Sequence, residues 1–397
     1  MHLVRTSLLF ALSTLLVACD RTAFHENGGE VVNSPTTTTA SDAAIRDSVK
    51  HVMDRALHDS AFPGAIAVVG RRSGIIEQYP VGRLDWAAGS AMVDAHTMYD
   101  MASLTKVVGM TSGLMQLVAA GRIDLDAPVQ KYLPAWTGRN KERVLVRNLS
   151  THTSGLPADR NYDQITHDPD SVAKLMFSTP LDTVPNARML YSDIGAYLLG
   201  RIVEQVTGQS LDLYLHDHVF EPTGMHESMF RPPVALYPRI APTEYDSAQR
   251  RRLIRGMVHD ERAYYLGGVS AHAGLFSSGN DVARFVRMMM NGGVLDGAQV
   301  IPAATIVQFT KRQTADRALG WQKPDGKNSA GHRMPEEAYG HTGFTGTSIW
   351  IDPKDDVFVV LLSNRVDPTR NNNKIGRYRV QLADAVMSVI LSDRSSR

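Results

Sequence analysis

The sequence predicts a mixed α/β protein of the α+β type, with an antiparallel sheet formed from both chain ends and flanked by helices. Three observations carry this prediction. β-rich runs lie near both ends of the chain, at residues 63–82 and 341–364. Stretches with helical apolar spacing lie outside them, at residues 42–57 and 373–392. The middle, about residues 107–290, is mostly helical and loop-like, so we expect a mainly helical region inserted into the sheet protein.

The first residues have the anatomy of an export signal. A short basic start precedes the apolar run Leu8–Ala18, which is shorter than the roughly 20 residues that span a bilayer. Residues 1–18 are therefore predicted to be a signal peptide. "LVAC", ending at Cys19, resembles the lipobox of bacterial lipoproteins, which implies that Cys19 is lipidated. An ordinary secretory signal, or a buried cysteine by chance, is the alternative.

Residues 19–41 follow as a polar stretch rich in Thr, Gly and Asn, without an apolar period. We expect a flexible tether there, followed by a folded domain over residues 42–397. Cys19 is the only cysteine, so the domain has no internal disulfide and depends on core packing.

The elements of the predicted sheet can be assigned in chain order. Residues 63–82 form a hairpin that turns at "RRSG". Near the C-terminus, "HTGFTGTSIWID" and "VFVVLLSN" are predicted to be two strands joined by the turn "PKDD".

A helix is predicted from Ser103 to Ala120, with Gly121 as its C-terminal stop. Lys106 lies one turn after Ser103, on the same face. Ser103 lies at the positive end of the helix dipole, where its backbone N–H is free to help hold an oxyanion. Lys106 can accept the serine proton only when neutral. Lowering its pKa from about 10.4 to near 7 requires about 4.6 kcal/mol, which an apolar pocket with a polar partner could supply.

The Ser-x-x-Lys spacing is not decisive by itself. A second example, Ser171 to Lys174, lies in "PDSVAKLM", where we expect the serine to cap a helix after Asp170.

Three motifs occur in a known order: "SLTK" at Ser103, "YSD" at Tyr191 and "HTG" at His341. Together they resemble S-x-x-K, Y-x-N and K/H-T-G of the serine β-lactamase and penicillin-binding protein superfamily. The stretches "AAGRIDLDAPVQKYLPAW", "VRNLSTHTSGLP" and "LGGVSAHAGLFSSGNDVARF" resemble its class C branch. No G-x-S-x-G motif occurs, which argues against an α/β-hydrolase.

The resemblance implies roles for individual residues. Ser103 would be the acylated nucleophile, and Lys106 and Tyr191 would share the general-base work, with the order of proton transfer left open. The backbone N–H groups of Ser103 and Phe344 would form the oxyanion hole. His341 and Thr342, followed by Gly343, would face the substrate. Neither a metal nor a cofactor is implied.

Two residues depart from the family pattern. Asp193 stands where Asn is usual; it could form an ion pair with Lys106, which would raise the lysine pKa, or be a solvated loop aspartate. His341 replaces the lysine of β-lactamases and is mostly neutral at pH 7, so it is a weaker anchor for a substrate carboxylate. Histidine here also occurs in D-alanyl-D-alanine peptidases and esterases of the superfamily.

Several histidines suggest no further chemistry. His259, Asp260, Glu261 and His272 match no common metal-ligand spacing, so we expect loop structure or pocket lining. His152 is expected to hydrogen-bond its turn. With 42 Lys plus Arg against 41 Asp plus Glu and no basic run, we expect no nucleic-acid partner.

We therefore expect an exported, lipid-anchored serine hydrolase of the periplasmic cell envelope. The predicted function is that of a D-alanyl-D-alanine-type peptidase or penicillin-binding protein, with a small-molecule or peptidoglycan-peptide substrate. A small-ester esterase or weak β-lactamase, a penicillin receptor with little turnover, and an envelope scaffold are the alternatives. Asp20 after Cys19 resembles an inner-membrane retention signal. The oligomeric state stays open.

Overall fold

The central sheet joins the two ends of the folded chain. The computed structural model describes residues 40–395, so the predicted signal peptide and Cys19 lie outside the described residues. Five antiparallel strands run in the order β10-β11-β12-β1-β2. Their bounds are β1 Gly64–Arg71, β2 Gly74–Gly82, β10 Tyr339–Thr342, β11 Ser348–Asp352 and β12 Val357–Ser363. The pairing of β1 with β12 confirms the predicted sheet.

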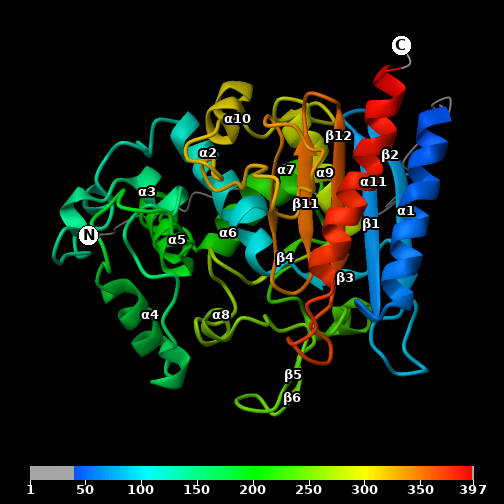
Figure 1. Cartoon of the computed structure of the whole chain (residues 1–397). Helices are drawn as coiled ribbons and strands as arrows, with labels where there is room; N and C mark the ends of the chain where they lie inside the picture. The colour runs from blue at the N-terminus through cyan, green and yellow to red at the C-terminus, as the bar shows by residue number, and fades with distance from the viewer. Residues whose placement is uncertain (1–39, 396–397) are drawn as a thin grey trace, which may run out of the picture. The chain divides into compact units, whose positions relative to one another are not determined.

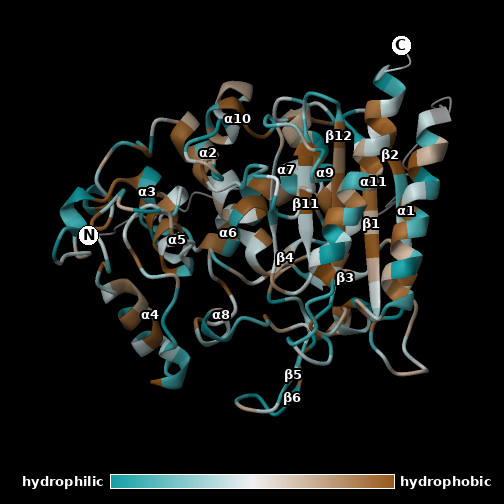
Figure 2. Ribbon diagram, viewed as in Figure 1, coloured by the Kyte–Doolittle hydropathy of each residue, from teal (hydrophilic) through white to brown (hydrophobic). Residues whose placement is uncertain are grey.

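The two faces of the sheet are covered by different helices. α1 (Ala40–His58) and α11 (Ile375–Ser395) lie side by side over one face (Figure 1). α1 begins inside the stretch predicted as tether. α9 (Gly279–Met290) packs on the other face, where Gly279, having no side chain, lies against Ile66 and Val68. Strands β1 and β12 are hydrophobic along most of their length, because both faces are buried (Figure 2).

The stretch from His341 to Asp352 is two strands, so the prediction of one strand was wrong. Residues 343–347 form a loop between β10 and β11, and Gly346 there has a φ of 124°. Two threonines bind this loop to other backbone, because Thr345 Oγ1 donates to Asp100 O at 2.7 Å and Thr347 Oγ1 donates to Met101 O at 3.1 Å. These contacts hold the loop against the residues just before Ser103.

The region between the sheet's two halves contains helices and short strands. Its helices are α2 Ser112–Ala119, α3 Val146–Ser150, α4 Pro169–Ser178, α5 Asp193–Thr207, α6 Leu211–Leu215, α7 Glu221–Thr223 and α8 Glu261–Tyr265. A second sheet pairs β3 Met98–Asp100, β7 Leu275–Ser278 and β4 Met229–Phe230. Smaller elements are β5 Tyr245–Asp246, β6 Arg252–Leu253, β8 Val294–Leu295, β9 Ala298–Gln299 and α10 Ala303–Thr310.

The helix that follows Ser103 is not α-helical at its start. A 3₁₀ turn, η1 (Ala102–Leu104), leads into a π-helical segment, η2 (Thr105–Thr111), before α2 begins. Two side chains bond to backbone five residues earlier: Thr111 Oγ1 donates to Lys106 O, and Ser112 Oγ donates to Val107 O. These bonds accompany the wider turn, a form that often occurs at functional sites.

The second Ser-x-x-Lys lies on α4, and its serine is not the cap. Asp168 is the N-cap, and its carboxylate accepts the Ser171 N–H at 2.9 Å. Pro169 occupies the first helical position, which proline favours, so the helix starts earlier than predicted.

None of the helices within residues 40–395 combines the length and the apolar character needed to cross a membrane.

The core of the sheet gives a stability prediction. Leu362 on β12 is fully buried, so Leu362→Ala should lower the free energy of unfolding by about 2–5 kcal/mol. Leu213→Ala is the matched control, because Leu213 is 58% exposed and its loss should cost little. Urea denaturation of both variants measures the difference. Equal losses would contradict the assignment of Leu362 to the core.

Candidate active site

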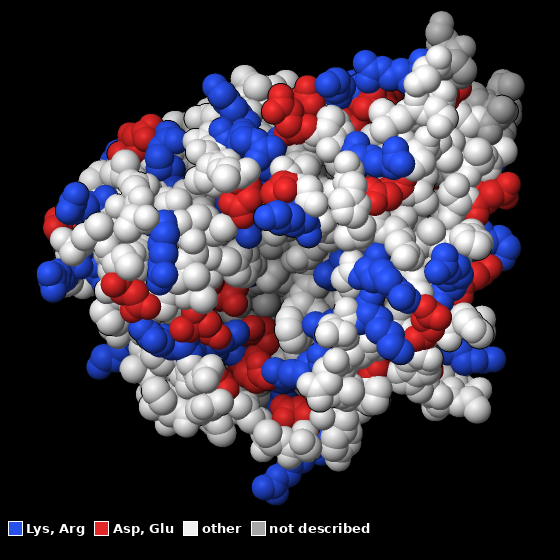
Figure 3. Space-filling view, viewed as in Figure 1, with Lys and Arg blue, Asp and Glu red and all other residues white. Residues whose placement is uncertain are grey.

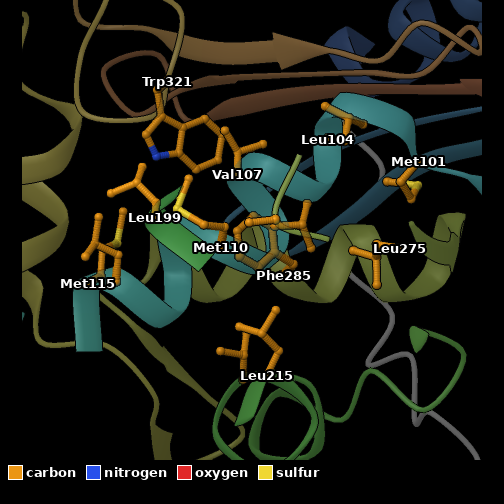
Figure 4. Packing of buried hydrophobic residues seen from close by; sticks show 14 of the residues in the cluster. Met101, Leu104, Val107, Met110, Met115, Leu199, Leu215, Leu275, Phe285 and Trp321 are labelled. Atoms are coloured by element: carbon orange, nitrogen blue, oxygen red, sulfur yellow. The ribbon is translucent and has the colours of Figure 1, made fainter. Parts of the chain in front are cut away.

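Ser103 and Lys106 meet on the segment η1–η2. Lys106 Nζ donates to Ser103 Oγ at 3.0 Å, and Lys106 is only 1% exposed. The neighbouring side chains Val107 and Met110 point into the hydrophobic core, towards Trp321, Phe285 and Leu215 (Figure 4). The segment is therefore rigidly packed, and Lys106 is a charged group among apolar neighbours.

The residue before the nucleophile has a strained backbone. Ala102 has a φ of 45°, which is uncommon for a residue with a side chain. Asp100 stabilises this conformation, since its Oδ1 accepts the Ala102 N–H at 2.8 Å. Asp100 is itself buried, which raises the pKa of its carboxyl group. This turn sets the direction in which the chain runs from β3 to Ser103.

Three oxygen atoms surround the Lys106 ammonium. Besides Ser103 Oγ, His272 O lies at 2.8 Å and Asp193 Oδ1 at 2.7 Å. Burial by itself lowers the lysine pKa, but the charge of Asp193 and the nearby Tyr191 outweigh it, and the pKa of Lys106 is raised. The expectation that apolar surroundings keep this lysine neutral is therefore wrong for the free protein. The alternative ion pair with Asp193 is present.

Tyr191 lies just before α5, whose N-cap is Ser192. Its hydroxyl is buried and makes no hydrogen bond to a residue in the described range. Burial raises the pKa of the hydroxyl, although Lys106 and Ser103 lie close enough to oppose that rise. Lys106 Nζ lies 5.0 Å from the ring centroid and Arg317 Cζ lies 5.3 Å from it. Tyr191 therefore has two cations near its ring.

A second layer of charges surrounds Asp193. The sequence assigned no role to Arg262, whereas Asp260 and His272 were expected to form loop structure or to line a pocket. Arg262 on α8 forms ion pairs with Asp159 and Asp260, and its Nη2 lies 3.8 Å from Asp193 Oδ2. Asp260 Oδ1 accepts from His272 Nε2 at 3.0 Å. Burial alone would raise the pKa of Asp260, but His272 and further donors lower it below its usual range. This network holds both Asp193 and the His272 carbonyl that binds Lys106.

The "HTG" segment at the end of β10 lies next to the turn that carries Ser103. His341 Nδ1 donates to Thr342 O at 2.8 Å, which leaves Nε2 as an unprotonated, buried acceptor without a partner among residues 40–395. Burial, followed by the charges of Arg317 and Lys106, lowers the pKa of His341 well below its usual value. His341 is therefore neutral at pH 7.

Gly343 allows β10 to approach the nucleophile closely. A Cβ at Gly343 would lie 2.5 Å from Met101 O and 2.1 Å from Thr347 Oγ1, so a side chain does not fit. Phe344 follows, with its ring 49% exposed. The backbone N–H groups of Ser103 and Phe344 donate to no residue that the structure describes. Two free donors therefore flank the point where β10 meets the serine turn.

The remaining histidines have structural partners. His152 Nδ1 accepts the Ser192 N–H at 3.1 Å, so His152 supports the segment that carries Tyr191 more than its own turn. His259 Nε2 bonds to Glu244 at 3.0 Å, and His272 Nδ1 bonds to Ser270 Oγ at 2.7 Å. These histidines orient loops around the site.

A pocket of about 440 Å³ opens beside this charge network. Figure 3 shows a hollow near the middle of one face, where acidic side chains gather. The charged residues that line the pocket are Asp159, Asp163, Glu244, Asp246, Glu261, Arg262 and Arg370.

Comparison with known proteins agrees with the fold and the motifs. The Beta-lactamase family matches residues 45–384. A Salmonella typhimurium protein named "Putative D-alanyl-D-alanine carboxypeptidase" is 31% identical, over 92% of this chain and 93% of its own length. A Salmonella schwarzengrund protein of the same name has the same identity and coverage.

Two solved structures share the fold. One is EstCE1, described as a hydrolase with promiscuous acyltransferase activity, with a TM-score of 0.71 at 21% identity over 88% of this chain and 100% of that chain. The other is a penicillin-binding protein homolog from Caulobacter crescentus, with a TM-score of 0.71 at 20% identity over 89% and 99% of the two chains. The chain thus belongs to the β-lactamase family of serine hydrolases, within the superfamily that includes the penicillin-binding proteins.

Proposed function

We propose that the protein is a D-alanyl-D-alanine-type peptidase that acts through an acyl-enzyme on Ser103. The observation that carries this proposal is the contact of Ser103 Oγ with a fully buried lysine, next to the hydroxyl of Tyr191. The names of the Salmonella relatives support the peptide substrate class. The neutral His341 agrees with a peptidase or esterase better than with an efficient β-lactamase.

The protonation states of Lys106 and Tyr191 determine how Ser103 becomes reactive. In the free enzyme Lys106 is protonated and Tyr191 is neutral, so one proton must leave this pair before it can act as a base. Lys106 is the member already in contact with Ser103 Oγ, so in our scheme it accepts the serine proton first. Tyr191 then relays that proton towards the leaving group.

The reaction divides into two steps. In acylation, the Ser103 Oγ–carbon bond forms and the peptide C–N bond breaks, and the serine proton passes to the departing amine. In deacylation, water attacks the ester carbonyl, the bond between that carbon and Ser103 Oγ breaks, and the acyl group leaves as a carboxylic acid. A proton of the attacking water passes to Ser103 Oγ through the same groups. The free N–H groups of Ser103 and Phe344 would stabilise the oxyanion in both steps.

An esterase is the second candidate. Its specific support is the neutral, buried His341, which provides no charge for a carboxylate and would tolerate an uncharged ester. A penicillin receptor with little turnover is distinguished by the lifetime of its adduct.

We also infer that the enzyme is exported and anchored to the periplasmic side of a membrane through lipidated Cys19. The support is the sequence of residues 1–20 alone.

The nucleophile can be tested against the second Ser-x-x-Lys of the chain. Ser103→Ala should abolish hydrolysis of D-alanyl peptides and covalent labelling by a fluorescent penicillin, while Tyr191→Phe should lower kcat by about 10²–10⁴-fold. Ser171→Ala is the matched control and should behave like the wild type. Mass spectrometry locates the adduct and follows its release. An active Ser103→Ala protein would refute the assignment, and a lasting adduct without turnover would indicate a receptor.

The role of Asp193 can be tested from the pH dependence of p-nitrophenyl acetate hydrolysis. The carboxylate raises the pKa of Lys106, so the wild-type kcat/KM should rise with pH as Lys106 loses its proton. In Asp193→Asn the raising charge is gone and burial lowers the lysine pKa, so the rising limb should move to lower pH. Asp168→Asn, at the cap of α4, should leave the profile unchanged. A limb that stays in place or moves to higher pH contradicts this scheme.

The anchor can be tested by phase partitioning with a detergent that separates lipoproteins. Wild-type protein should enter the detergent phase and carry acyl groups on Cys19, whereas Cys19→Ala should remain in the aqueous phase. Asp20→Ser should move the lipoprotein from the inner to the outer membrane fraction. Recovery of Cys19→Ala in the membrane fraction would argue against lipidation as the anchor.

A further inference from the structure

Two arginines bind the backbone of the loop between β10 and β11. On α11, Arg379 Nη2 donates to Gly343 O and to Thr347 O, both at 2.7 Å. After β12, Arg365 Nε donates to Phe344 O at 2.9 Å, and its Nη1 donates to two further carbonyl groups that fix the side chain in turn. Charged donors therefore hold two consecutive carbonyl groups of the loop, those of Gly343 and Phe344.

The guanidinium of Arg379 is placed for these carbonyl groups and not for an ion pair. No carboxylate among residues 40–395 lies within ion-pair distance of it, whereas Arg377 on the same helix pairs with Asp59. Burial, together with the charge of Arg365, lowers the pKa of Arg379 to about 9, so the group stays charged at neutral pH. A charge removed from water needs acceptors, and here backbone oxygen atoms supply them.

The Gly343 carbonyl matters for the reaction because it belongs to the same peptide unit as the Phe344 N–H. This unit is planar, and it is trans, since the one cis bond within residues 40–395 joins Asp367 and Pro368. Its carbonyl and N–H therefore point in opposite directions, so a donor that fixes the carbonyl also fixes the N–H. The Gly346 N–H donates to the same carbonyl at 3.2 Å, a longer bond than that of the arginine.

The charge of the arginine adds a second effect to this fixed direction. A hydrogen bond to a carbonyl oxygen polarises the peptide unit, which makes its N–H a stronger donor on the opposite side. The effect is larger for a charged donor, because charge-assisted hydrogen bonds are stronger than neutral ones. Arg379 is thus the charged group bonded to the far end of the peptide unit whose free N–H would face an oxyanion.

We propose that Arg379 is a positioning residue for the oxyanion hole, which directs the Phe344 N–H and strengthens it as a donor. It bonds to carbonyl groups and acts through the peptide unit. Negative charge develops on the same oxygen in acylation and deacylation, so loss of Arg379 should slow both steps and leave ground-state binding nearly unchanged. The inference rests on the proposed acyl-enzyme at Ser103, but not on a peptide substrate.

The test replaces Arg379 and follows hydrolysis of p-nitrophenyl acetate. Arg379→Met removes the charge and the donors and should lower kcat by about 10- to 100-fold, which is less than the roughly 10²–10³-fold cost of losing an oxyanion donor outright. KM should change less than about threefold, because both steps slow alike. Arg379→Lys, which keeps a charged donor, should recover part of the loss, and so should ethylguanidinium added to Arg379→Ala. Arg377→Met is the matched control on α11 and should behave like the wild type.

A transition-state analogue separates positioning from a merely structural role. Phenylboronic acid forms a tetrahedral adduct through a bond between Ser103 Oγ and boron, so its Ki should rise at least about fivefold in Arg379→Met. Thermal unfolding checks each variant. An unchanged kcat, or a lower kcat with an unchanged Ki, would overturn the proposal. If Arg379→Met does not fold, Arg379→Gln, which keeps a donor without the charge, should lose kcat and boronate affinity together, and wild-type values of both would overturn it.

The outcomes also separate this inference from the peptidase function. If the wild type cleaves p-nitrophenyl acetate but no D-alanyl peptide, and Arg379→Met loses kcat and boronate affinity, the peptidase function fails and the role of Arg379 stands. If D-alanyl peptides are cleaved equally well by the wild type and Arg379→Met, the role of Arg379 fails and the peptidase function stands. If the ester is not turned over, the rate of labelling by a fluorescent penicillin takes the place of kcat.

Discussion

The site depends on keeping one ammonium group, that of Lys106, out of water. Burying a charge without partners is costly, so oxygen atoms must be in place to receive it. They come from different parts of the chain: the Ser103 hydroxyl from the preceding turn, a carboxylate from the start of α5, and a carbonyl from residue 272 before β7. The arrangement of these segments is therefore tied to the stability of the buried lysine. The same contacts orient the lysine towards the nucleophile.

The nucleophile and the oxyanion donors are held together by a second set of contacts. Threonine hydroxyls in the β10–β11 loop donate to the carbonyls of Asp100 and Met101, and Gly343 permits the close approach. The strained Ala102 lies between these contacts and Ser103. Because backbone contacts on both sides restrain this residue, the geometry of the serine turn is defined by the sheet and not by the helix alone.

The charges of the site are arranged in layers. In the inner pair, the opposite charges of Lys106 and Asp193 neutralise each other. Arg262 on α8, together with its acidic partners, supports this pair from outside. Tyr191 has two cations near its ring, Lys106 and Arg317, and the neutral His341 lies beside it. The neutral His341 stands at the lysine position of the family's "K-T-G" motif, and the cations whose charges act on it, Arg317 and Lys106, come from other segments of the chain.

Much of the protein could be predicted from the sequence by itself. Apolar periodicity and turn residues predicted α1, α11, the β1–β2 hairpin and a sheet made from both chain ends, because these signals are local. The three motifs identified Ser103, Lys106 and Tyr191 as a group, and the substitution at Asp193 pointed to the ion pair that the structure contains. The break between β10 and β11 was missed, because it is caused by contacts with distant backbone at Asp100 and Met101.

The protonation state of the site was decided only by the tertiary structure. An apolar sequence around Lys106 suggested a neutral lysine, but the sign of its pKa shift depends on whether a carboxylate lies within a few ångströms, and spacing along the chain does not measure that distance. Arg262 and Arg317 likewise belong to no motif, and His272 lies in a stretch that resembles the family without a role there being implied. They act at the site because helix α8 and the loops before β7 and β10 fold against it. The sequence determined which groups could react, and the packing determined their charges and which of them lack a partner.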